Sequence, residues 1–139
     1  VPVIRYADIL LIYAEALNED NGGPNQEAYE AVNMVRRRAY GEDIFSPSTV
    51  DLPENLSQQE FREAVWEERR WEFAGEYHRW YDLKRTNRLE SVVSYWLENG
   101  EETNEGQATG SFQTPRHLLY PIPQTELDAN PNLTQNPGY

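Results

Sequence analysis

The sequence contains no cysteine and little positive charge. Without cysteine the chain forms no disulfide, no thiolate zinc site and no cysteine nucleophile. Its 12 lysines and arginines face 24 acidic residues, which leaves a formal net charge of −12. A protein that follows the phosphates of a nucleic acid, or that charge alone holds on anionic lipid, needs the opposite sign. The composition therefore excludes these two classes and predicts no nucleic-acid partner.

A long apolar run is missing as well. No stretch approaches the roughly 20 apolar residues of a membrane-spanning helix. Aromatic residues nevertheless make up 12% of the chain, which is too many for a disordered protein. The length of 139 residues suits one domain. These features predict a single folded, acidic domain over residues 1–139.

A helix hairpin is predicted over residues 4–39. Within 4–19 apolar residues recur at i, i+3, i+4 and i+7, and further apolar side chains widen this face. We therefore expect this helix to be buried on more than one side. Asn-Gly-Gly-Pro at 21–24 ends it, and small residues in a second helix, 25–39, allow close packing. The pair is tetratricopeptide-like, and one such unit cannot bury its own faces, so either the rest of the chain caps it or other repeats are missing.

A central helical segment is predicted over residues 57–98. Ser57 and Glu60 have the spacing of a capping box, which opens a long helical stretch over 58–86. Aromatic side chains lie on several sides of this stretch, with arginines among them, so we expect it to be mostly buried. On a single helix, one narrow aromatic stripe would contain Trp66, Phe73, Tyr77 and Trp80, and Arg70 would fall within it. Its replacement by leucine is expected to destabilise the fold by on the order of 3–5 kcal/mol, because a buried carboxylate partner would be left unpaired.

Residues 99–139 are predicted to be a loop and a tail. The first part is acidic and rich in glycine, and the second contains several prolines that forbid a helix interior or a central strand. The predicted fold class is therefore mostly α. An antiparallel, tetratricopeptide-like helix pair packs against a long central helix, with long irregular loops and an extended, proline-rich C-terminal tail.

Four glutamates of the central segment are the candidates for a catalytic pair, since glycoside hydrolysis uses two carboxylates that flank the sugar bond. They are Glu67, Glu68, Glu72 and Glu76. The alternative is that these side chains pair with arginines along the helix. His78 and His117 have no metal-ligand spacing near either of them, so no metal site is predicted. No nucleophile elbow and no phosphate-binding glycine loop occurs, and we predict no catalytic residue and no cofactor.

Three blocks in the sequence carry a resemblance to a known family. The first is RYADILLIYAEALNE at 5–19, followed by AVNMVRRRAYG at 31–41. The second is ERRWEFAGEYHRWYDLKR at 68–85, and the third is LLYPIPQTELDANPNLTQNPGY at 118–139. In this order and spacing they resemble the C-terminal part of the SusD/RagB family of Bacteroidetes outer-membrane nutrient-binding lipoproteins. The resemblance covers almost the whole chain.

This resemblance implies a mostly helical protein with tetratricopeptide-like helix pairs. It implies a lipoprotein on the outer face of the outer membrane, anchored through an N-terminal cysteine that this sequence lacks. The implied partner is a SusC-like TonB-dependent transporter, over which the binding protein sits as a lid, and the implied ligands are glycans or, in some members, peptides. Because family members are several-fold longer, the chain is expected to be the C-terminal part of a larger protein.

The charged residues that match the family blocks are interpreted as a packing and ion-pair signature of the fold. They are Glu68, Arg69, Arg70, Glu76, Arg79, Asp82 and Arg85. No ligand-binding residue is carried over from the family. The leading hypothesis is a glycan-binding protein that catalyses no reaction. The alternatives are a tetratricopeptide-like interaction module without sugar binding, based on 4–39, and a glycoside hydrolase.

Overall fold

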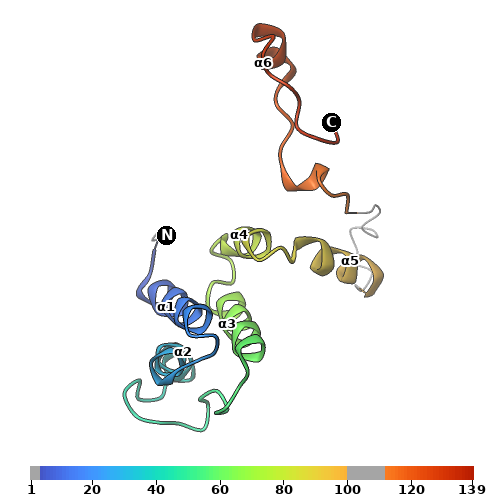
Figure 1. The fold of residues 1–139 in the computed structure, drawn as a ribbon. Coiled ribbons are helices and arrows are strands. Elements are labelled where there is room, and N and C mark those ends of the chain that lie inside the picture. The colour runs from blue at the N-terminus through green and yellow to red at the C-terminus, as the bar shows by residue number, and fades with distance from the viewer. Residues whose placement is uncertain (1–3, 100–111) are drawn as a thin grey trace, which may run out of the picture. The chain divides into compact units, whose positions relative to one another are not determined.

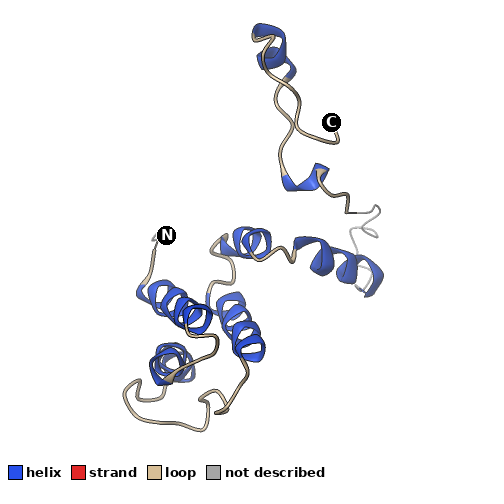
Figure 2. Ribbon diagram, viewed as in Figure 1, coloured by secondary structure: helices blue, strands red, loops and turns tan. Residues whose placement is uncertain are grey.

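The computed structural model describes residues 4–99 and 112–139, and within these ranges all regular structure is helical (Figure 2). The prediction of a mostly α fold is confirmed. The chain divides into two compact units, Val1–Arg79 and Trp80–Tyr139. Whether 1–139 behave as a single domain stays a prediction. No helix among the described residues is long and apolar enough to cross a membrane.

The first unit packs three helices together (Figure 1). Helix α1 (Tyr6–Asp20) and helix α2 (Gln26–Tyr40) follow each other after a short turn, as the helix hairpin prediction requires. Helix α3 (Gln58–Glu72) begins at the predicted capping box of Ser57 and Glu60 and contacts both earlier helices. The order of these elements therefore follows the sequence pattern closely.

The core of this unit lies between the three helices. Each helix contributes apolar side chains that are almost completely buried, namely Leu11, Ala14, Ala28, Ala31, Val32, Val35, Phe61 and Val65. The alanines allow the helix axes to approach closely, as their spacing predicts. The ring of Phe61 meets the edge of Tyr29 at 5.0 Å between centroids, which places a large apolar side chain at the centre of the core.

The prediction of one continuous helical stretch over 58–86 is wrong, because the helix is interrupted. Helix α3 ends at Glu72, and helix α4 (His78–Arg85) begins after a turn in which Gly75 has φ +81° and Tyr77 has φ +66°. Both values lie in the left-handed region, which a right-handed helix cannot pass through. Tyr77 is 86% exposed as a result, so the narrow aromatic stripe that a single helix would carry does not form.

Two predictions of burial are also wrong. The side chain of Arg70 is 48% exposed and pairs with Glu67 on the same helix, because it lies one residue beyond the buried Arg69 and so points away from the core. Helix α1 is buried on one side among the described residues. Apolar side chains on its other side, including Ile9 and Ile12, are half exposed.

The second unit contains most of α4, followed by helix α5 (Leu89–Asn99), the 3₁₀ helix η1 (Arg116–Leu118) and helix α6 (Gln124–Ala129). Asn87, with φ +55°, separates α4 from α5. The loop predicted after residue 99 lies mostly outside the described residues.

The last five residues, 135–139, form a C-terminal clip on the extended segment 119–122. The amide of Gln135 pairs with the backbone of Ile122 in both directions, at 2.8 and 2.9 Å. The side chains of Asn136 and Tyr139 donate to the carbonyls of residues 120 and 119, respectively. This arrangement satisfies the backbone of an extended segment without a partner strand.

Glycine is required at position 138 of the clip. Gly138 has φ +95°, and a Cβ atom there would lie 2.7 Å from the Cβ of Arg116. The guanidinium of Arg116 in turn lies over the ring of Tyr139, at 5.1 Å from its centroid. A side chain at position 138 would therefore push the clip away from η1.

We predict that Gly138→Ala opens the C-terminal clip. The strain of a left-handed alanine, about 1–2 kcal/mol, adds to the clash with Arg116. The amide hydrogen of Ile122 should then exchange with solvent about tenfold faster or more, measured by hydrogen exchange. Gln124→Ala, which removes an exposed side-chain hydrogen bond within α6, should leave this rate unchanged. An unchanged rate in Gly138→Ala would contradict the assignment.

Candidate functional site

An arginine–carboxylate cluster forms in the first unit, where the start of α1, the end of α2 and the end of α3 meet. Its members are Arg5, Arg36, Arg38, Arg69, Asp8, Glu68, Glu72 and Glu76. Basic residues occupy the last turns of α2 and α3, where the negative end of the helix dipole favours them. The cluster is therefore placed by the helix ends themselves.

Arg5 joins the start of α1 to the end of α3. Its guanidinium donates to Glu72 Oε1 at 2.7 Å and to both carboxylate oxygens of Glu76 at 2.8 and 2.9 Å. It also donates to the backbone carbonyl of Glu72, at 2.9 Å, in the last turn of α3. The hydrogen bonds that Arg5 donates to Glu76 and Glu72 raise the pKa of Arg5, and Arg5 lowers the pKa of Glu76. One side chain thus caps a helix and pairs with two acids.

Arg69 and Asp8 form the most deeply buried pair of the cluster. Arg69 Nη1 lies 2.7 Å from Asp8 Oδ1, and both side chains are less than a tenth exposed. The ring of Phe73 lies within cation–π distance of two guanidinium groups, those of Arg5 at 4.9 Å and Arg69 at 5.1 Å. His78 stacks on the same ring at 4.6 Å. Phe73, only 3% exposed, therefore organises the charges around it.

Glu68 and Glu72 face α2 from the last turns of α3. Arg36 Nη1 donates to Glu68 Oε2 at 2.7 Å, and Arg38 pairs with Glu72. Burial raises the pKa of Glu68, and Arg36 offsets only part of this effect. Glu72 is almost fully buried and bridges Arg38 to Arg5. These two carboxylates link all three helices of the first unit.

The four glutamates considered for catalysis are each held by an arginine. Glu67 pairs with Arg70, Glu68 with Arg36, and Glu72 and Glu76 with Arg5. Glycoside hydrolysis needs a proton-donating acid and a carboxylate on either side of one sugar bond. The pairing of these carboxylates with guanidinium groups favours a structural role for them over a catalytic one. Among the described residues, no group of three or more histidine, cysteine or acidic side chains could hold a metal ion.

The seven residues of the predicted signature divide between the two units. Glu68, Arg69 and Glu76 belong to the cluster, whereas Arg70 lies on the surface outside it. In the second unit, Arg85 Nε donates to Asp82 Oδ1 at 2.9 Å. The seventh residue, Arg79, is half-buried in the first turn of α4. That these residues form a signature of the family stays a prediction.

Arg37, which the sequence did not single out, is a fully bonded arginine. Its five N–H groups make five hydrogen bonds, two to Asp51, two to Glu30 and one to the carbonyl of Ile44. The side chain is 2% exposed. The hydrogen bonds that Arg37 donates to Asp51 and Glu30 raise the pKa of Arg37, and Arg37 lowers the pKa of Asp51. Arg37 therefore anchors the connection between α2 and α3.

Other polar side chains of α2 hold the same connection. Arg36 donates to the carbonyl of residue 50, while the side chains of Asn33 and Tyr29 accept from the backbone N–H groups of residues 52 and 56. The connection thus runs back along α2 and delivers Ser57 to the start of α3. A spacing of four and three residues between these α2 positions is the sequence signal that could have revealed this polar face.

Comparison with known proteins identifies relatives of this chain. A sequence model of the SusD family (SusD_RagB) matches residues 1–139. The chain is 41% identical to the SusD-like protein P25 of Formosa agariphila, over 99% of this chain and 24% of that protein. It is also 41% identical to the SusD-like protein P2 of the same organism, over 98% of this chain and 25% of that protein.

Two solved structures are similar as well. A SusD homolog from Bacteroides thetaiotaomicron matches with a TM-score of 0.83 and 41% identity, covering 99% of this chain and 26% of that one. A SusD superfamily protein from Parabacteroides distasonis matches with a TM-score of 0.68 and 38% identity, covering 99% and 27%. The chain belongs to the SusD family and spans about a quarter of the length of the curated relatives it matches.

We predict that Arg37→Met is far more damaging than Arg70→Met. Removing Arg37 leaves Asp51 without its buried partner, which should cost roughly 3–5 kcal/mol of unfolding free energy. Removing Arg70 breaks an exposed pair on one helix and should cost less than about 1 kcal/mol. Denaturant unfolding of the two variants measures the difference. Equal losses would show that the burial of Arg37 does not matter for stability.

Glu68→Gln and Glu76→Gln should change the pH dependence of stability in opposite directions. The raised pKa of Glu68 means that the folded state holds this proton more tightly, so its ionisation lowers stability as pH rises from its ordinary pKa through the raised one. Glu68→Gln should therefore gain stability relative to the wild type over this range.

The lowered pKa of Glu76 has the reverse effect, since its contribution is present above the ordinary pKa and is lost as pH falls through the lowered one. Glu76→Gln should be less stable than the wild type at neutral pH, and the difference should vanish in acid. Denaturation curves between pH 3 and pH 8, roughly spanning the carboxylate pKa range, test both signs. Parallel pH profiles for the two variants would contradict this assignment.

Proposed function

We propose that this chain is part of a cell-surface nutrient-binding protein that captures a glycan. The complete protein would hold its ligand on a preformed surface and deliver it to a SusC-like TonB-dependent transporter in the outer membrane. Membership of the SusD family supports this proposal. Because the chain spans about a quarter of its relatives, ligand capture is proposed for the whole protein, to which these helices contribute a rigid part.

The protein would bind its ligand without breaking a bond. The observation that carries this part of the proposal is the arginine pairing of the glutamates on α3 and the turn after it. Arg5 lowers the pKa of Glu76 and holds its carboxylate ionised and in place, which suits neither the proton donor of a glycosidase nor a mobile base. The ligand would therefore leave the protein unchanged.

The proposed location is the outer face of the outer membrane. A lipid on an N-terminal cysteine, in a part of the protein outside this sequence, would provide the anchor. The net charge of −12 fits an anchor of this kind better than electrostatic attachment to anionic lipid. The predicted signature residues would keep the helices in place for both ligand and transporter.

Calorimetric titration of the full-length protein with oligosaccharide and peptide libraries tests the proposal. We expect saturable binding of an oligosaccharide, recovery of that oligosaccharide intact, and co-purification of a TonB-dependent transporter from membranes. Glu67→Gln, which removes one acid of the exposed pair with Arg70, serves as a matched variant that should not alter binding. Cleavage of the ligand that this variant abolishes would make the protein an enzyme. Absence of both ligand and transporter would contradict the proposal.

A second candidate function is a tetratricopeptide-like interaction module without sugar binding. The half-exposed apolar side chains on one side of α1 favour it, because such patches mark interaction sites. This candidate requires that side to stay open in the purified full-length protein.

A further inference from the structure

Tyr77 combines a strained backbone with an exposed side chain. Its φ of +66° lies in the left-handed region, and among the described residues other than glycine only Asn55 and Asn87 share a positive φ. Asparagine adopts this conformation at modest cost, whereas a bulky residue there is an outlier. The side chain of Tyr77 is 86% exposed, and its hydroxyl group forms no hydrogen bond with another described residue. The contacts of Tyr77 within the described residues therefore do not offset the strain.

The turn that carries Tyr77 is anchored on both sides of this residue. Before it, the backbone N–H of Glu76 donates to the carbonyl of Phe73 at 3.0 Å, and the carboxylate of Glu76 accepts two hydrogen bonds from Arg5, at 2.8 and 2.9 Å. After it, His78 stacks on the buried ring of Phe73 at 4.6 Å between centroids. Both neighbours of Tyr77 in the sequence thus contact the first unit, and Tyr77 projects from a rigid turn into solvent.

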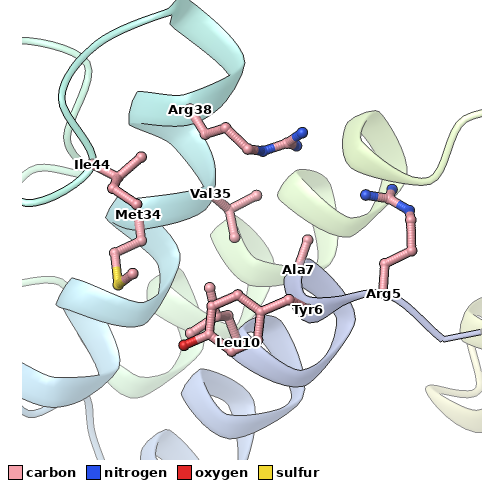
Figure 3. A pocket seen from close by; sticks show the side chains of 8 residues that line it. All are labelled: Arg5, Tyr6, Ala7, Leu10, Met34, Val35, Arg38 and Ile44. Atoms are coloured by element: carbon pink, nitrogen blue, oxygen red, sulfur yellow. The ribbon is translucent and has the colours of Figure 1, made fainter.

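The hollow between α1 and α2 is too small and too apolar to enclose a sugar chain. Its volume is about 220 Å³, below the roughly 300–1,000 Å³ of small-molecule sites (Figure 3). Its lining includes Tyr6, Leu10, Met34 and Ile44, with two arginines beside them. Against such apolar side chains, sugar hydroxyl groups would lose the hydrogen bonds that they make in water. A glycan is therefore expected to contact the first unit on its open surface.

We propose that Tyr77 is a glycan-contact residue, whose ring stacks on one sugar of the bound ligand and whose hydroxyl group hydrogen-bonds to a sugar hydroxyl. The C–H groups on one face of a pyranose form a flat apolar surface that suits an aromatic ring, and a phenol O–H both donates and accepts. A ring presented by a rigid turn loses little conformational freedom on binding. The inference rests on the proposed function and names one contact through which it would act.

The strain at position 77 supports a role in binding over a role in folding. Residues in sparsely populated backbone regions persist where the surrounding structure holds them, and they concentrate at functional sites. Glycine adopts a positive φ without strain, so the fold alone would favour glycine at this position. Tyr77→Gly therefore removes the ring and the strain together, and it separates the two roles.

Calorimetric titration of full-length Tyr77→Gly with a panel of neutral and anionic tetrasaccharides tests the inference. For each tetrasaccharide that binds the wild type, we expect the variant to bind about tenfold more weakly or worse. Its denaturant midpoint of unfolding should be no lower than that of the wild type, because the strain is gone. Tyr77→Phe, which keeps the ring, should retain most of the affinity. Tyr120→Ala, which removes a tyrosine that is 82% exposed, is the matched control and should bind as the wild type does.

The outcomes separate this inference from the proposed function. A wild type that binds a tetrasaccharide, with equal affinity in Tyr77→Gly, would overturn the inference and leave the proposed function standing. Unchanged affinity together with loss of a co-purifying transporter would overturn it in favour of a protein contact at this turn. A wild type that binds no member of the panel would contradict the proposed function, and this inference with it.

Hydroxyl-radical footprinting of the full-length wild type keeps the inference testable if Tyr77→Gly does not fold. Oxidation of each tyrosine is measured by mass spectrometry, without and with a saturating tetrasaccharide. We expect Tyr77 to be oxidised in the free protein and to be clearly protected when the tetrasaccharide is bound, while oxidation of Tyr120 stays unchanged. Tyr77 that is unreactive in the free protein, or equally reactive in both states, would overturn the inference.

Discussion

A guanidinium group can be buried in this protein only where carboxylates and carbonyl oxygens surround it, and the first unit depends on that constraint. Arg69 and Asp8 bind α3 to α1 beneath the surface, and Arg37 has every N–H group satisfied by Glu30 of α2 and by the connection between α2 and α3. Desolvating either arginine without its acids would be strongly unfavourable. The helices are therefore held in one arrangement by pairs that apolar packing alone would not specify, which suits a rigid surface for binding.

The same pairing determines what the acids can do. Glu76 accepts two hydrogen bonds from Arg5, and its pKa is lowered, so it stays ionised and immobile. Glu68 is the exception, since burial raises its pKa, but Arg36 occupies it from α2. An acid that is neutralised by a scaffold contact contributes to stability and recognition geometry more readily than to proton transfer. Chemistry and architecture in this unit therefore support the same proposal of binding without catalysis.

Sequence patterns predicted the helix hairpin and the capping box because both depend on neighbours within a few residues. They failed where the burial of a side chain changes from one helix position to the next, since Arg69 is buried and the adjacent Arg70 is exposed. The break after α3 had a visible signal in Gly75, which the aromatic pattern outweighed. The partners of Arg5, and the pairing of Arg37 with Asp51, were not predictable, because these ion pairs join positions separated by a turn of the fold. Glu30, the other partner of Arg37, lies seven residues away on the same helix. From the sequence one could infer only that buried arginines require carboxylate partners, and not which residues form the cluster.

The failed expectation for α1 is the most informative of these differences. Its sequence specifies a helix that is apolar on two opposite sides, and in the structure α2 and α3 cover only one of them. A pair of helices has two outer faces, and a third helix can close one of them. The remaining apolar residues, Ile9 and Ile12 among them, would promote aggregation if they stayed on an exposed surface. Exposed apolar residues of this kind mark interaction surfaces, which is the observation that favours the second candidate function.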